Sequence, residues 1–259
     1  MHYLTENTLW LLYPFVITYI FTPFLDTYFG EDNSNHPDEV QSDLEKIPYY
    51  KILTYIAVPI HIFVFFISAF YIGLIPLSLL EILLISASAG LVSGIAINTG
   101  HELGHKKTKI ERSLAKIVLS IPAYGHFTIE HNRGHHSNVS TPEDAASAKM
   151  GENIYEFALR EMPESFKNAI SIEKKRLHRL GKSFWCFDNE LMQSFSLTLI
   201  FQVGLLISFG LVMAPFLLVH NLFAWWQLTS ANYIEHYGLL REKLSNGRYE
   251  LCKPYHSWN

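Results

Sequence analysis

Three short segments of the chain hold six of its 13 histidines. The segments are HELGHKK (101–107), EHNRGHH (130–136) and NYIEHYG (232–238), and the histidines are His101, His105, His131, His135, His136 and His236. Neutral imidazole is the commonest protein ligand for transition metals, and six imidazoles exceed what a single tetrahedral zinc ion accepts. The sequence therefore predicts a site for more than one metal ion.

The spacing within these segments supports metal binding. His101 and His105 lie four residues apart, as do His131 and His135, and on an α-helix this spacing places both rings on one face with Cβ atoms about 5–6 Å apart. His136 points in an adjacent direction, toward a second metal or to complete the first. Carboxylates close to metal ligands often hold the second nitrogen of an imidazole, although direct ligation stays open. The candidates for this role are Glu102, Glu130, Glu235, Asp144 and Asp188.

The remaining histidines carry less information. We expect five of them to be ordinary solvated or hydrogen-bonded residues, and these are His2, His36, His61, His178 and His220. His126 lies one helical turn ahead of Glu130, and its role is left open.

The composition is that of a membrane protein. Hydrophobic residues make up 49% of the chain and charged residues 17%, against about 25% charged residues in a typical soluble domain. The net charge of −4 gives no indication of nucleic-acid binding. Two cysteines, Cys186 and Cys252, are too few and too far apart for a disulfide framework or a thiolate metal site.

Long stretches with almost no charge predict an all-α integral membrane protein, a single domain over residues 1–259. A helix that crosses the membrane needs about 20 apolar residues, so the uncharged run 195–230 must turn, near Ser208–Gly210. Gly90 and Gly94 form a GxxxG step, for which we expect packing within the bundle rather than a homodimer face. The five expected crossings are residues 8–25, 52–75, 77–99, 195–210 and 211–232.

Charge placement predicts the orientation. All the lysines and arginines lie in 26–51, 100–194 and 233–259, which five crossings put on one side of the membrane. The positive-inside rule makes that side cytoplasmic. All three histidine segments fall there too, so we expect a helical, histidine-rich cytoplasmic cap.

At these motifs the chain resembles the membrane-bound alkane 1-monooxygenases, non-haem di-iron enzymes within the histidine-box group of desaturases and hydroxylases. Further matching stretches are FGED (29–32), NTGHELGHKK (98–107), YGHFTIEHNRGHH (124–136), CFDNE (186–190) and WWQLTSANYIEHYGLLR (225–241). The resemblance implies six membrane helices and two non-haem iron ions held by the six clustered histidines. It also implies a multi-pass protein of the bacterial inner membrane whose active site faces the cytoplasm.

The implied reaction is hydroxylation of the terminal methyl of medium-chain n-alkanes to 1-alkanols with O2. Electrons would come from a rubredoxin and its NAD(P)H-dependent reductase. In that family a further histidine box of the form HLQRHSDHH follows the HSWN segment, where this chain stops at Asn259. We therefore expect a piece of a longer enzyme that lacks the first helix and the last histidine box, and that has incomplete activity alone.

An apolar substrate would enter from the lipid bilayer. The candidate residues lining its path are Phe15, Thr18, Tyr19, Thr22, Trp225 and Trp226, with ordinary packing and interface anchoring as the alternative. A basic run suits docking of an acidic electron-transfer protein or contact with anionic headgroups. This run comprises Lys174, Lys175, Arg176, Arg179 and Lys182.

Three other functions remain. HELGH satisfies the H-E-x-x-H motif, so a membrane zinc metalloprotease is the main alternative, although it leaves EHNRGHH without a purpose. Another histidine-box hydroxylase or desaturase acting on lipids or aromatics is a second. A transporter is the weakest, because the histidines follow the helix ends rather than lie at mid-bilayer.

Overall fold

The computed structural model describes residues 2–30 and 47–258, and this part of the chain is helical apart from turns, loops and one isolated bridge between Lys243 and Tyr249. The predicted all-α class is confirmed. His36 and most of the acidic connection, including Glu31 and Asp32 of FGED, lie outside the described residues. The long helices are α5 (Pro48–Leu74), α6 (Leu79–His105), α10 (Ile154–Arg179), α11 (Glu190–Phe209) and α12 (Met213–Glu235).

Four stretches of the described chain are long and apolar enough to cross a membrane: Thr8–Phe29, α5, α6 and Glu190–Glu235. The last comprises α11 and α12, joined by the short 3-10 turn η4 (Gly210–Val212). Gly210 begins this turn with a φ of +75°, a conformation that glycine adopts without strain. The protein is therefore a bundle of membrane-length helices, and the exact crossings stay predictions.

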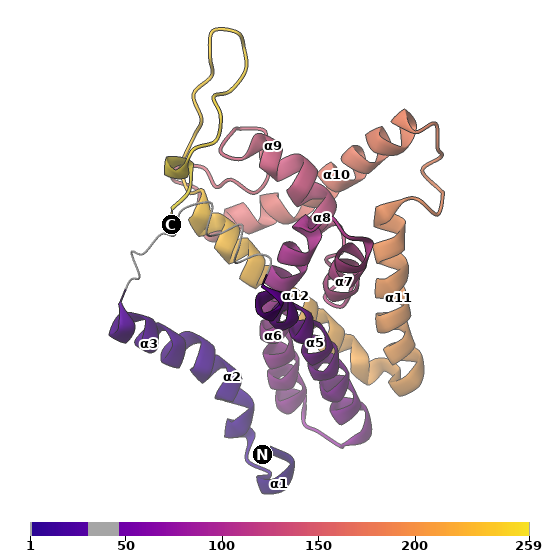
Figure 1. Cartoon of the computed structure of the whole chain (residues 1–259). Helices are drawn as coiled ribbons and strands as arrows, with labels where there is room; N and C mark the ends of the chain where they lie inside the picture. The colour runs from indigo at the N-terminus through magenta and orange to yellow at the C-terminus, as the bar shows by residue number, and fades with distance from the viewer. Residues whose placement is uncertain (1, 31–46, 259) are drawn as a thin grey trace.

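The N-terminal stretch, for which a crossing is expected over 8–25, is built from short helical elements of different types. It consists of η1 (Thr8–Leu12), α2 (Tyr13–Val16), the π-helical turn η2 (Ile17–Phe21) and α3 (Thr22–Phe29). Pro14 and Pro23 each remove a backbone donor, which interrupts the regular hydrogen-bond ladder. Together with α1 (His2–Thr5), these short elements lie along one side of the bundle (Figure 1).

Helices α6 and α12 pack closely because α6 carries small residues at the contact. A Cβ added at Gly90 would lie 2.6 Å from the carbonyl oxygen of His220, and one at Gly94 would lie 2.5 Å from Cγ of Gln227. The GxxxG step thus serves packing within the bundle, as expected. This contact fixes α6, which continues past the expected crossing and carries His101 and His105 in its last turns.

The segment after α6 departs from the expected cytoplasmic cap. Helix α7 (Lys109–Ser120) turns back along α6, and Ile121 at its end joins the buried core that contains Phe65 and Phe216. The amide of Gln202 on α11 donates to the carbonyl of Ile121 at 3.0 Å. Part of 100–194 therefore lies inside the bundle, because the end of α7 is apolar and can be buried only there.

The rest of this region covers the end of the bundle. It consists of α8 (Phe127–Glu130), the π-helical turn η3 (His131–His135), α9 (His136–Asn138) and α10, which packs against α8 and α12 (Figure 1). The chain after α12 forms an extended loop with the short η5 (Pro254–His256). These elements surround the histidine segments.

Candidate metal centre

The first pair of histidines has the geometry that its spacing predicts. The Nε2 atoms of His101 and His105 lie 2.9 Å apart on the last turns of α6. The other end of α6 is held by a capping box in which Ser78 and Glu81 exchange hydrogen bonds. The two imidazoles therefore project from a rigid element.

The second segment pairs its histidines differently from the expectation. The chain winds as a π turn over His131–His135, and in a π turn residues five apart come together. As a result His136, rather than His135, presents its Nε2 to that of His131, at 3.0 Å. The expectation of a simple α-helical pair of His131 and His135 is corrected here, although their rings still stack with centroids 5.1 Å apart.

Four imidazoles from the two segments share one centre. His101, His105, His131 and His136 each offer a ring nitrogen, and these four atoms lie within 4.8 Å of one another. Ligands about 2.0–2.1 Å from a tetrahedral ion stand roughly 3.3 Å apart, close to the spacing of the two facing pairs. Burial and the neighbouring histidines lower the pKa of His131 to about 2, and burial and His105 lower that of His136. Both rings are thus held in the neutral form that binds metals.

A second pair of imidazoles lies beside this cluster. The rings of His135 and His236 have centroids 5.1 Å apart, and the Nε2 of His236 is buried with no hydrogen-bond partner in the described part of the chain. Its Nδ1 donates to the carbonyl of His256 at 2.9 Å. Nδ1 of His135 donates to a buried carboxylate, that of Asp144, at 3.0 Å. Both rings therefore keep Nε2 free, the arrangement typical of metal ligands.

Asp144 is the best supported of the candidate carboxylates. It is buried and also accepts hydrogen bonds from the hydroxyl of Ser147 at 2.6 Å and the backbone amide of Ala146 at 3.2 Å. Burial opposes its charge, but these hydrogen bonds and His135 outweigh that effect and lower the pKa of Asp144. The same contact raises the pKa of His135 despite its burial.

The other four carboxylates differ in their surroundings. Glu102 and Glu235 are about half exposed, 3.7 and 3.8 Å from a ring nitrogen of His101 and His236 respectively. Glu130 is buried, and burial together with the charge of Asp144 raises its pKa to about 7. Asp188 lies in the loop before α11, where it pairs with Lys182 at 2.5 Å. Its expected contact with a clustered histidine is therefore not found among the described residues.

Two residues of the site were missed by the sequence analysis. His256 holds His236 through its backbone carbonyl, a role that no residue type reveals. Glu161 on α10 is 1% exposed and accepts hydrogen bonds from Thr229 (2.9 Å) and Asn232 (3.3 Å) on the helix that leads to His236. Glu161 lies four residues from both Phe157 and Ser165, which are buried, so the spacing could have indicated that all three share the buried face of a helix.

The candidates for the substrate path have packing or hydrogen-bond roles. Phe15 packs edge-on against Phe223, with centroids 5.6 Å apart, and the amide of Gln227 donates to the Tyr19 hydroxyl at 2.6 Å. The Thr22 hydroxyl donates to the carbonyl of Ile17 and the Trp225 indole donates to the carbonyl of Pro122. The Trp226 ring stacks on Tyr155, and Thr18 is half-buried.

The histidines outside the clusters are mostly accounted for. His61 and His220 both bond the hydroxyl of Ser93, at 2.8 and 2.7 Å, and His2 bonds Tyr71 and Glu81. His178 is exposed. His126 is buried, and neither of its ring nitrogens has a hydrogen-bond partner among the described residues.

The sequence of the chain is similar to those of known proteins. The fatty acid desaturase family matches residues 77–259. Alkane 1-monooxygenase 1 of Alcanivorax borkumensis is 52% identical, over 99% of this chain and 64% of its own length, and alkane 1-monooxygenase of Pseudomonas putida is 51% identical, over 99% and 65%. Alkane 1-monooxygenase 2 of Pseudomonas aeruginosa is 35% identical, over 96% and 67%. The chain thus spans about two thirds of the length of these relatives.

Proposed function

Since the chain belongs to the fatty acid desaturase family, and within it to the alkane 1-monooxygenases, we propose that it hydroxylates the terminal methyl of medium-chain n-alkanes to 1-alkanols with O2. The observation that carries this proposal is the convergence of four ring nitrogens within 4.8 Å, beside a second pair of imidazoles with free Nε2 atoms. Imidazole ligands suit iron, and six of them are enough to serve two ions.

We assign the ligands to two groups. His101, His105, His131 and His136 would hold one non-haem iron, and His135 and His236 would contribute to a second. Bound iron would supply reductive activation of O2, the chemistry that insertion into a C–H bond requires.

The chain's own residues prepare the ligands. Asp144 holds the Nδ1 proton of His135, and the carbonyl of His256 holds that of His236, so Nε2 is the ligating atom in both rings. Burial and the neighbouring histidines keep His131 neutral. Glu161 fixes the end of α12, and hence His236, against α10.

The substrate path is proposed to run along the N-terminal stretch. Phe15 and Tyr19 lie against α12 through Phe223 and Gln227, so an apolar chain entering there from lipid would approach the ends of α6 and α12. Thr18, Thr22, Trp225 and Trp226 complete the proposed lining.

Electrons are proposed to come from a rubredoxin with an NAD(P)H-dependent reductase. The proposed setting is a bacterial inner membrane with the metal centre facing the cytoplasm. This orientation is supported by the placement of lysine and arginine at the ends of α5, α6 and α12 that carry or adjoin the histidines.

The zinc protease alternative receives no support. Its general base would be Glu102, whose side chain is 55% exposed rather than aimed at the centre of the four nitrogens. A zinc protease also needs only three protein ligands, whereas four imidazoles converge here.

The direct test is conversion of n-octane by the iron-loaded chain in membranes with rubredoxin, its reductase and NADH. We expect 1-octanol, identified by gas chromatography and mass spectrometry, with incorporation of one oxygen from labelled O2. Because incomplete activity is expected of this chain alone, the contrary results are oxidation at a subterminal carbon or an alcohol whose oxygen does not come from O2.

A further inference from the structure

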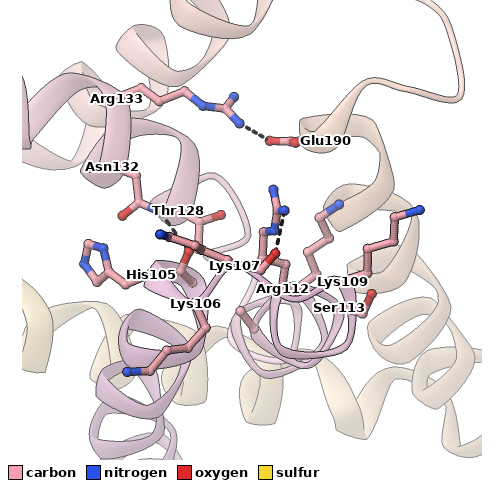
Figure 2. A pocket seen from close by; sticks show the side chains of 13 residues that line it. His105, Lys106, Lys107, Lys109, Arg112, Ser113, Thr128, Asn132, Arg133 and Glu190 are labelled. Carbon is pink, nitrogen blue, oxygen red and sulfur yellow. Dashed lines mark hydrogen bonds and ion pairs between the residues drawn. The ribbon is translucent and has the colours of Figure 1, made fainter. Parts of the chain in front are cut away.

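A pocket of about 530 Å3 opens between the end of α6, helix α7 and the start of α11 (Figure 2). We call it the basic pocket, because six cationic side chains line it and Glu190 is its one carboxylate. The six cations are Lys106, Lys107, Lys109, Arg112, Lys116 and Arg133.

The charges of the basic pocket are not balanced within the described chain. Glu190 pairs with Arg133 at 2.8 Å, and Arg133 also faces the buried Glu173 at 3.5 Å. Across residues 2–30 and 47–258, the ammonium groups of Lys106, Lys107 and Lys109 pair with no carboxylate. The pocket therefore presents an excess of positive charge to whatever enters it.

Lys116, in the wall of the pocket, adds a second indication. Its ammonium is partly buried and hydrogen-bonds the neutral amide oxygen of Gln193 at 2.5 Å. Burial lowers the pKa of Lys116 despite the nearby carboxylates of Glu190 and Glu173. An anion in the pocket would offset the cost of removing this charge from water.

A second, apolar pocket of about 310 Å3 adjoins the first. We call it the aromatic groove, and it is lined by Trp185, Cys186, Phe187, Met192, Gln193 and Ser196. Gln193 connects the two pockets, since its amide oxygen binds Lys116 and its amide nitrogen donates to the carbonyl of Phe187 at 2.6 Å. Trp185 is 76% exposed and Phe187 fully exposed.

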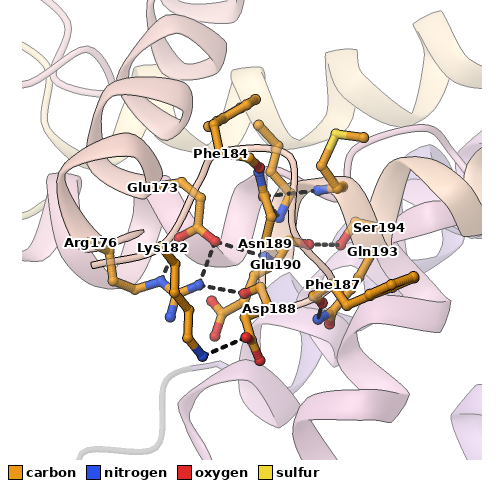
Figure 3. Close-up of polar contacts among 12 residues, drawn as sticks. Glu173, Arg176, Lys182, Phe184, Phe187, Asp188, Asn189, Glu190, Gln193 and Ser194 are labelled. Carbon is orange, nitrogen blue, oxygen red and sulfur yellow. Dashed lines mark hydrogen bonds and ion pairs between the residues drawn. The ribbon is translucent and has the colours of Figure 1, made fainter. Parts of the chain in front are cut away.

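The loop that carries these rings is firmly held (Figure 3). The guanidinium of Arg176 donates to the carbonyl of Asp188 at 2.6 Å, and the amide of Asn189 donates to the carbonyl of Phe184 at 2.8 Å. Glu173 binds both Arg176 and the backbone amide of Glu190. Exposed aromatic rings on a fixed loop are typical of an interaction surface.

The position of both pockets indicates the partner. They lie at the end of α6 and at the beginning of α11, both of which belong to membrane-length stretches. The ends of such stretches lie at the level of the lipid headgroups. Aromatic rings gather at this level, and basic pockets between helices there bind anionic headgroups. Below the groove, α11 exposes Leu199, Ile200 and Val203 along the path of an acyl chain.

We propose that this corner of the protein binds one anionic phospholipid, with its phosphate in the basic pocket and an acyl chain over the aromatic groove. An acidic soluble protein would match the cations alone and would leave the aromatic rings uncovered. His105 of the proposed metal centre also lines the basic pocket, but the proposal rests on the cations and the aromatic rings and not on a bound metal or the reaction.

The test uses the full chain in detergent with one of two probes, dioleoylphosphatidylglycerol or dioleoylphosphatidylcholine, and counts bound lipid by native mass spectrometry. We expect one phosphatidylglycerol to be retained in preference to phosphatidylcholine. Lys109→Gln with Arg112→Gln should weaken retention roughly 30-fold, since each basic residue near an anionic surface contributes about one factor of five. The matched control, Lys243→Gln with Arg248→Gln, removes the same charges from the exposed loop after α12 and should leave retention unchanged.

Two further arms separate the sources of binding. Phe187→Ser changes an exposed side chain and should reduce retention of phosphatidylglycerol without loss of helix content by circular dichroism. Inorganic phosphate should fail to displace the lipid at millimolar concentration. Equal retention of both lipids, equal effects of the two double variants, displacement by phosphate alone, or an acidic rubredoxin that competes for Lys109 and Arg112 would each overturn the proposal.

Discussion

His131 and His136 face each other through their Nε2 atoms at 3.0 Å, although they lie five positions apart in the sequence. The π turn between them is what brings these two rings together, and it turns His135 toward His236 instead. One segment of chain therefore supplies imidazoles to both groups of the proposed metal centre. This division gives the predictions below.

The approach of α6 to α8 should depend on the absence of a side chain at Gly104. An added Cβ would lie 2.7 Å from Cγ2 of Thr128, so Gly104→Ala should push His101 and His105 away from His131. We expect less metal bound per chain, measured by elemental analysis. Thr128→Ser removes the clashing methyl and should restore binding in the double variant. Full metal content in Gly104→Ala alone would contradict this account.

The hydrogen bond of Asp144 should control the affinity of the second metal group. Asp144→Asn removes the charge that holds the Nδ1 proton of His135, and loss of such a partner typically costs about 10- to 100-fold in metal affinity. Competition with a chelator measures this affinity. Glu143→Gln, a change at the adjacent and exposed carboxylate, is the control and should have no effect. Equal affinities for the two variants would exclude the proposed role.

The contribution of Glu130 to the stability of the metal-free chain should fall as pH rises through the range set by its pKa. Burial raises the pKa of Glu130 from 4.5 to about 7, so the folded state holds a proton that the unfolded state releases, and stability is lost between these values. Glu130→Gln keeps the shape of the side chain and removes its charge. The free energy of unfolding of the variant, relative to wild type, should therefore be up to about 3 kcal/mol more favourable to the folded state at pH 8 than at pH 4. Thermal unfolding at the two pH values checks this, with Glu242→Gln, an exposed site, as the control. A difference in stability between wild type and Glu130→Gln that is the same at the two pH values would be the contrary result.

Glu161 should tie α12 to α10. Glu161→Ala leaves the buried hydroxyl of Thr229 and the amide of Asn232 without an acceptor, at a cost of about 1–3 kcal/mol for each group. Glu161→Gln keeps an acceptor and avoids a buried charge, and it should be close to wild type. Because α12 leads to His236, the alanine variant should also bind less metal. Thermal unfolding and metal content together test this, and an alanine variant equal to the glutamine variant in both would refute it.

The sequence was sufficient to predict the parts of the structure that follow from local pattern. Uncharged runs predicted an all-helical bundle, and spacing predicted the pairing of His101 with His105. The π turn at His131–His135 was not predictable in this way, because its extra residue per turn is stabilised by tertiary contacts and not by residue type. The burial of Ile121 was missed for the related reason that a polar stretch on either side concealed a short apolar one.

Roles carried by backbone groups were also beyond sequence reasoning. The carbonyl of His256 holds His236, and any residue offers the same group. Asp188, in contrast, was overvalued, since its neighbour in space is Lys182 rather than a histidine. Side-chain chemistry could identify the ligands, whereas their supports depend on how distant segments meet.

The metal content of each chain shows whether two groups of imidazoles hold two irons. We predict two irons and no zinc per chain after loading with iron under reducing conditions, about one iron in His236→Ala, and loss of the four-histidine group in His101→Ala with His136→Ala. A single zinc ion with no iron, or an iron content that none of these substitutions changes, would contradict the account.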